Sequence, residues 1–152
     1  MSYVVDFANP ASPQVSAPLV LGRSNGSTPL LLDGSTVYTS RWVNSSTEGR
    51  VRFFVDRVSL GGTGPAAVLP SINVPGSLLS VDGTANRMVT VDYRRLTRSA
   101  NDWNDCTGNF YSYNDTYFDS DTHQCIQVER SLKLVDFSSN RATLRQTMPL
   151  TT

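Results

Sequence analysis

The chain of 152 residues has room for one domain with a substantial hydrophobic core, and it is too short for two ordinary domains. Its formal net charge is zero, and charged residues make up 17% of it, against roughly 25% in an average globular domain. A balanced charge without a basic arm argues against nucleic acid as a partner, and no apolar segment reaches the roughly twenty residues that cross a membrane.

The kinds of charged residue predict a protein with little helix. All basic residues except Lys133 are Arg, and all acidic residues except Glu48 and Glu129 are Asp. Lys and Glu usually fill exposed helix faces, whereas Asp favours turns and caps. The Arg excess has two interpretations, a GC-rich genome or many bidentate contacts with partner subunits.

The first 33 residues are expected to form an extended, proline-rich arm. Pro10, Pro13, Pro18 and Pro29 interrupt this segment, and proline lacks the N–H donor that a central strand needs. Asp33-Gly34 then predicts a tight hairpin turn. We therefore divide the single domain into an arm over residues 1–33 and a β body over residues 34–152.

The body contains several segments with the composition and alternation of β-strands. We expect strands over residues 36–43, 50–60, 78–81, 87–97, 124–135 and 141–148. Asp82-Gly83 predicts a second hairpin turn, and the glycines and prolines between Gly61 and Gly76 predict a long surface loop. The expected fold class is all-β: a single antiparallel β-sandwich, a jelly roll or a partly open barrel with long loops.

The clearest alternation lies between residues 124 and 135. Ile126, Val128, Leu132 and Leu134 fall on one face, and polar residues fall on the other. This pattern is typical of a half-buried antiparallel strand.

Residues 101–123 form an acidic, aromatic loop, which Cys106 and Cys125 are placed to close. The two cysteines either form a disulfide that closes this loop or are buried thiols, and we favour the disulfide. A bridge of this span would stabilise the fold by on the order of 3 kcal/mol. It would suit a protein that works outside a reducing cytosol.

Recognisable catalytic machinery is missing from the sequence. His123 is the only histidine, so a base for a nucleophilic triad is hard to supply, although a pair with Cys125 is conceivable. One histidine and two separated cysteines cannot form a zinc site. We expect no catalytic residues, no cofactor and no enzymatic activity.

The loop offers weak calcium candidates and several contact candidates. Asp102, Asp105, Asp119 and Asp121 could supply the oxygen ligands that calcium prefers, although no EF-hand spacing is present. Trp103-Asn104-Asp105 followed by Cys106 resembles the calcium- and sugar-binding signature of C-type lectin domains, over four residues only. The resemblance implies sugar binding as an alternative. The aromatic residues that could stack on a sugar or a partner are Trp103, Tyr111, Tyr113, Tyr117 and Phe118.

Arg94, Arg95 and Arg98 form the one local basic cluster, which we interpret as an ion-pair patch between subunits. Together these features favour a non-enzymatic structural protein of a virus or bacteriophage particle: a decoration, minor capsid or tail component. Its partners would be protein subunits, either copies of itself in a homo-oligomer or a major capsid protein, and its location the virion. The alternative is a secreted carbohydrate-binding or adhesion module, to which calcium could contribute, although a signal peptide is not evident.

Overall fold

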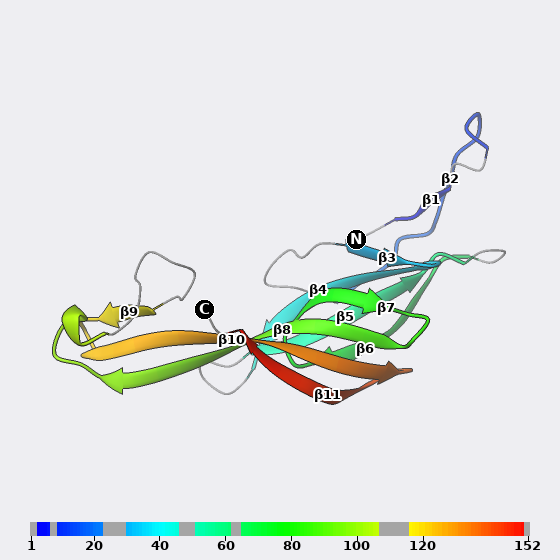
Figure 1. Ribbon diagram of the computed structural model, residues 1–152. Coiled ribbons are helices and arrows are strands. Elements are labelled where there is room, and N and C mark those ends of the chain that lie inside the picture. The colour runs from blue at the N-terminus through cyan, green and yellow to red at the C-terminus, as the bar shows by residue number, and fades with distance from the viewer. Residues whose placement is uncertain are drawn as a thin grey trace.

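The chain is an all-β protein with two antiparallel sheets stacked as a sandwich (Figure 1). The computed structural model describes residues 3–6, 9–22, 30–45, 51–61, 65–106 and 116–150. Its elements are β1 (Val5–Asp6), β2 (Gln14–Val15), β3 (Leu30–Asp33), β4 (Thr36–Asn44), β5 (Val51–Ser59), β6 (Ala67–Val74), β7 (Ser77–Asp82), β8 (Arg87–Ser99), the short 3-10 helix η1 (Trp103–Asp105), β9 (Thr116–Asp119), β10 (Gln124–Ser138) and β11 (Arg141–Leu150).

Strand neighbours in the first sheet follow the order of the chain, and in the second sheet β10 lies between β8 on one side and β9 and β11 on the other. The first sheet has the order β3-β4-β5-β6, and the second has the order β11-β10-β8-β7 with β9 beside one end of β10. Hairpins therefore build each sheet. The two Asp-Gly turns were predicted correctly: Gly34 connects β3 to β4 with a φ of 55°, and residues 83–86 connect β7 to β8.

The long loop predicted between Gly61 and Gly76 is wrong, because residues 67–74 form strand β6. This strand lies at the edge of the first sheet, where a proline can be accommodated. The pairing of β5 with β6 shifts register between Val55 and Arg57, which places Pro70 and Ser71 at a bulge. A bulge interrupts the hydrogen-bond ladder, so the missing N–H of Pro70 does not prevent the strand.

The core lies between the two sheets. It is built from buried side chains of β4 to β8 and β10, namely Tyr38, Val55, Ile72, Val74, Leu78, Met88, Val135 and Phe137. Tyr38 and Phe137 meet across the sandwich as an edge-to-face pair, with ring centroids 6.3 Å apart. Burial of these side chains supplies the main stabilising term.

Two residues of the predicted apolar face of β10, Leu132 and Leu134, point away from this core, whereas Ile126 of the same series is fully buried in the projection end of the strand. Val135 pairs with Met88 and both are buried in the core, so the alternating neighbours Leu134 and Val89 point to the other side of the sheet. Leu132 and Val91, two pairs further along, lie on the same side as Leu134 and Val89. The alternation itself was predicted correctly, but the leucines that carry it lie on the side opposite the sandwich core.

Strands β8 and β10 extend far beyond the sandwich (Figure 1). Their pairing is continuous, from Arg87 opposite Asp136 to Ser99 opposite Gln124. The neighbouring strands are shorter: the pairing of β7 with β8 stops at Val91, and the pairing of β11 with β10 begins only at Arg130. At about 3.3 Å per residue, the six pairs beyond Tyr93 and Arg130 reach roughly 20 Å. We call residues 94–99 and 124–129 the projection, and residues 100–106 and 116–123 its tip.

The N-terminal segment forms a small hairpin and then joins the sandwich. Val5 pairs with Val15 and Asp6 with Gln14, and Figure 1 shows this hairpin pointing away from the body. Leu19 is buried, and Gly22 lies against the side chain of Arg41, so this segment covers part of the outer side of the first sheet. Residues 30–33, which the sequence placed in the arm, belong to the sheet as β3.

Candidate interaction surface and disulfide-closed tip

A disulfide between Cys106 and Cys125 closes the tip. It joins the end of η1 to the start of β10, and the Cα atoms of the two cysteines lie 5.4 Å apart. Ala100 is buried beside the bridge, and Phe118 from β9 packs against the same small cluster. The bridge that we favoured from the sequence is confirmed, and it anchors residues that lie far from the main core.

The tip aspartates act mainly as acceptors for backbone N–H groups. Asp102 Oδ1 accepts from Asn104 N at 2.7 Å, and Asp105 Oδ2 accepts from Asn101 N at 2.7 Å. Asp119 Oδ1 accepts from Asp121 N at 3.0 Å and from Thr122 N at 3.3 Å. Hydrogen bonds from Thr122 lower the pKa of the Asp119 carboxyl and keep it ionised.

The calcium candidates at the tip do not gather into one cluster of acidic side chains. Within the described parts of the chain, no group of three or more His, Cys, Asp or Glu side chains is placed to hold a metal ion. The four calcium candidates are therefore not brought together, although Asp102, Asp105, Asp119 and Asp121 all lie at the tip.

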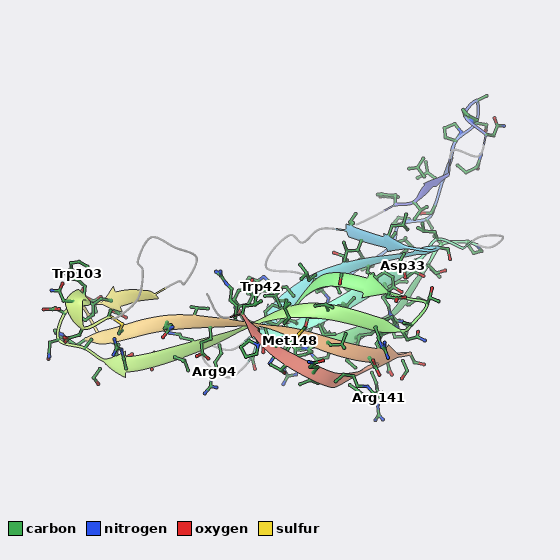
Figure 2. The ribbon with its side chains drawn as sticks, viewed as in Figure 1. Asp33, Trp42, Arg94, Trp103, Arg141 and Met148 are labelled. Carbon is green, nitrogen blue, oxygen red and sulfur yellow. A yellow bond between two sulfur atoms is a disulfide. The ribbon has the colours of Figure 1, made fainter. Side chains whose placement is uncertain are left out.

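The contact candidates of the loop differ in their placement. Trp103 is 58% exposed at the end of the projection (Figure 2), whereas Phe118 is half-buried and meets the His123 ring edge-on at 6.1 Å. Tyr117 is placed by its backbone alone, opposite Ile126, and Tyr111 and Tyr113 lie outside the described residues. Trp103 is the described candidate that offers an accessible aromatic surface.

His123 has no thiol to activate. Cys125 is bonded to Cys106, so the conceivable pair of Cys125 and His123 cannot supply a nucleophile in this structure. His123 instead occupies a tight turn, with a φ of 51°, and its carbonyl accepts from Ala100 N at 3.0 Å.

The three arginines of the basic cluster lie along β8 in the projection. Arg98 donates to the Asp105 carbonyl and so holds the tip within its own chain. Arg94 lies opposite Glu129 on β10, and Arg95, on the other face, contributes to the lowered pKa of Asp119. Their expected role in ion pairs between subunits stays a prediction.

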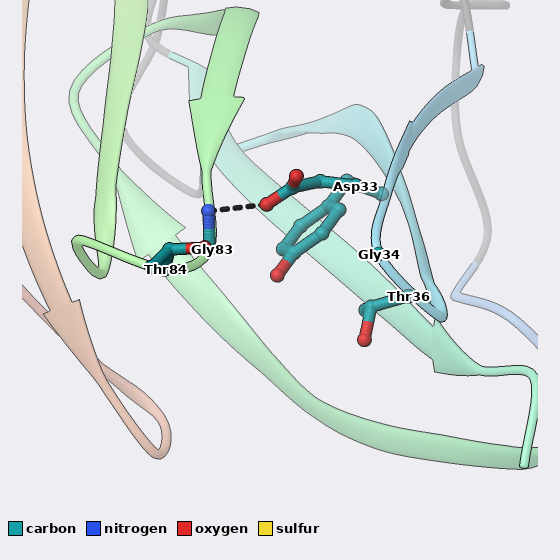
Figure 3. Close-up of a pocket in the computed structure, with 6 residues that line it drawn as sticks. Asp33, Gly34, Thr36, Gly83 and Thr84 are labelled. Carbon is teal, nitrogen blue, oxygen red and sulfur yellow. Dashed lines mark hydrogen bonds between the residues drawn. The ribbon is translucent and has the colours of Figure 1, made fainter. Parts of the chain in front are cut away.

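A shallow pocket of about 250 Å³ lies where the two Asp-Gly turns meet (Figure 3). Asp33 Oδ2 accepts from Gly83 N, and Tyr38 lines the pocket beside it. Burial raises the pKa of the Tyr38 phenol, and the nearby Asp33 carboxylate raises it further. The lining combines one carboxylate with small and hydroxyl side chains. The hydrogen bond from Gly83 N to the Asp33 carboxylate joins the turn of one sheet to the turn of the other.

The sequence indicated an apolar face that includes Leu132 and Leu134, but it did not show that this face lies on the outer side of the second sheet. The side chains there are Val89, Val91, Leu132, Leu134 and Met148, all half-buried or exposed. The available signal was the change of phase along β10, where the apolar series of Leu132 and Leu134 gives way to Val135 and Phe137. A strand that is apolar on both faces is typical of a sheet that is covered on both sides.

Comparison of the chain with protein-family models, curated proteins and solved structures found no match. Within the described residues, no helix has the length and apolar character that crossing a bilayer requires.

Removal of the disulfide is expected to destabilise the tip more than the sandwich. In the double variant Cys106→Ser with Cys125→Ser, the free energy that holds the tip folded should fall by about 3 kcal/mol. Hydrogen exchange should show faster exchange in residues 98–106 and 118–127, with core amides of β5 little changed. Equal loss of protection throughout the chain would contradict a local role, and reduced wild-type protein is the matched control.

Proposed function

We propose that this chain is a non-enzymatic structural protein that acts through contacts between subunits, as a decoration, minor capsid or tail component of a virus or bacteriophage particle. The observation that carries the proposal is the pair of strands β8 and β10, which continue about 20 Å beyond the sandwich. Elements that leave the body of a domain can reach a neighbouring subunit, and a surface that is apolar but not enclosed by its own fold favours such contacts.

Two further features support this proposal. The hairpin of β1 and β2 also points away from the body, so a second element is available for a neighbour (Figure 1). The disulfide suits a particle that leaves the reducing cytosol, which supports a virion location. In this role the chain would bind other protein subunits, either copies of itself or a major capsid protein.

The proposal is tested by the association state of the protein and by its genetic setting. Sedimentation velocity of the full chain between about 1 and 100 μM should show concentration-dependent oligomers, because subunit contacts of this kind obey mass action. Genes for capsid and portal proteins should flank the coding sequence. Flanking genes for glycan metabolism or cell adhesion would contradict the particle assignment even if the protein self-associates.

A secreted carbohydrate-binding or adhesion module is the second candidate. The observation that favours it is Trp103, 58% exposed at a disulfide-closed tip, where an indole ring could stack on a sugar. Binding on a glycan array, with or without calcium, that disappears in Trp103→Ala would support this candidate and oppose the first. A blank array under both conditions would remove it.

A further inference from the structure

We infer that the tip of one subunit docks on the outer face of the second sheet in another copy of this chain. The outer face consists of Val89, Val91, Leu132, Leu134 and Met148 on β8, β10 and β11. The inference rests on the proposed role in subunit contacts and names the two surfaces that meet.

The outer face is the apolar side of the second sheet that does not meet the other sheet, and four of its five residues are half-buried. The partner sheet packs on the opposite side, against Met88, Val135 and Phe137. Met148 remains 41% exposed, and Leu150 beside it remains 47% exposed. By contrast, residues 19–22 of the chain itself cover part of the outer side of the first sheet. Apolar side chains gathered in this way favour a protein partner.

Charges around this face are predominantly basic. Strand β11 carries Arg141 and Arg145 and no acid. Arg145 and Arg87 both reach Asp136, at one end of the face, and this contact with Arg145 lowers the pKa of the Asp136 carboxyl. At the other end, Arg130 lies over the ring of Tyr93 at 5.6 Å. Arginines thus lie at both ends of the apolar surface, and at the first end Asp136 and Asp82, which pairs with Arg87, balance part of their charge.

The tip has the complementary character. Residues 100–106 and 116–123 contain four Asp and no Lys or Arg, although the whole chain is neutral. An exposed Trp103 stands among these acids. Tryptophan is enriched at the centres of protein interfaces, and opposite potentials on two surfaces speed and orient their association. Arg95 and Arg98 at the base of the tip balance part of this negative charge, and the acids that remain face outward around Trp103. Such a tip and a face edged by arginines suit the chain to bind its own copies head to tail.

Geometry favours contact between two chains. Figure 2 shows Trp103 at the far end of the projection and Met148 near the place where the projection leaves the sandwich. Because β8 and β10 stay paired over the six residue pairs between these places, the tip is held away from the face of its own chain. The contact joins two different surfaces. Repeated in one direction it generates a ring or filament, and exchanged reciprocally by two copies it forms a twofold dimer.

Two variants, each defective in one surface, test the inference. The tip variant combines Trp103→Ala with Asp121→Lys. The carboxylates of Asp102, Asp105 and Asp119 accept backbone N–H groups and so support the tip, whereas no such bond to the Asp121 carboxylate is found among the described residues. The face variant is Met148→Glu, which places an acid where the acidic tip would dock. Leu30→Glu is the matched control, because Leu30 is 69% exposed on the first sheet.

Each defective variant alone should sediment as a monomer, with self-association weakened about ten-fold or more. An equimolar mixture should form a dimer with one copy of each, because the mixture contains one intact tip and one intact face. The dimer also proves that both variants are folded at the surface they retain. The control should associate like the wild type.

Three results would overturn the inference. A mixture that stays monomeric would exclude the pairing of tip with face. A tip variant that associates like the wild type, while the face variant does not, would indicate a symmetric contact between two faces. Wild-type association that neither variant weakens would place the contact elsewhere, and in that case the proposed function would still stand.

Discussion

Replacing Arg57 by Ala is expected to destabilise the protein by about 4 kcal/mol, because a buried side chain leaves a cavity and two charge-assisted hydrogen bonds to carbonyl groups are lost. Arg57 is only 8% exposed, and its guanidinium donates to the Pro70 carbonyl at 3.0 Å and to the Ser139 carbonyl. These contacts link the bulge of β6 to the turn between β10 and β11. The side chain therefore ties the first sheet to the second.

Burial of this cation has a cost of its own. Burial lowers the pKa of the Arg57 guanidinium, and its Nε has no hydrogen-bond partner among the described residues. The ring of Phe137 offsets part of this cost, with its centroid 5.8 Å from the guanidinium carbon. We attribute the net stabilisation to the two charge-assisted hydrogen bonds, which join the two sheets, and to the packing of this buried side chain.

Urea unfolding followed by circular dichroism measures the effect, with the slope checked for two-state behaviour. Arg87→Ala is the matched control. Arg87 also pairs with a carboxylate, Asp136, but its side chain is 58% exposed, so its loss should cost less than about 1 kcal/mol. If Arg57→Ala were no more destabilising than Arg87→Ala, water would be replacing the guanidinium at both carbonyls.

Substituting Gly76 by Ala is expected to cost a similar amount, about 4 kcal/mol, through backbone strain and a direct clash. Gly76 lies in the turn between β6 and β7 with a φ of 121°, a conformation that L side chains rarely adopt. An added Cβ would lie 2.9 Å from Asp92 N and closer still to the Val91 carbonyl oxygen. Backbone atoms of a central strand cannot move aside without disturbing β8.

Gly34→Ala provides the comparison for this prediction. Gly34 also has a positive φ, of 55°, but an added Cβ there would meet nothing within 4 Å. It should cost about 1 kcal/mol, the penalty of the left-handed conformation alone. Thermal unfolding of both variants separates the two contributions. Equal melting temperatures would show that the turn at Gly76 relaxes and that the clash does not limit stability.

The association of Cys106 with Cys125 and the acidic character of residues 100–123 were accessible to sequence reasoning, because spacing and composition are local properties. The exposure of Trp103 was not, since loop aromatics can equally pack beneath their own loop. The same limit applies to Asp102, Asp105 and Asp119. Their carboxylates are engaged by neighbouring backbone N–H groups, a geometry that depends on the conformation of each turn.

The sequence by itself determined the all-β class, the two Asp-Gly hairpins and most strand positions, because alternation, β-branched residues and turn residues act over a few neighbours. Only the tertiary structure decided that residues 67–74 form an edge strand, since a proline is tolerated there by its position in the sheet and by the bulge opposite Asp56. It also decided which face of β10 is covered. A period of two separates two faces without saying which one meets the other sheet, and the bulge between Leu134 and Val135 in the pairing with β11 lies where the apolar phase changes. For that reason Leu132 and Leu134 lie on the outer face of the second sheet, where we propose that another copy docks.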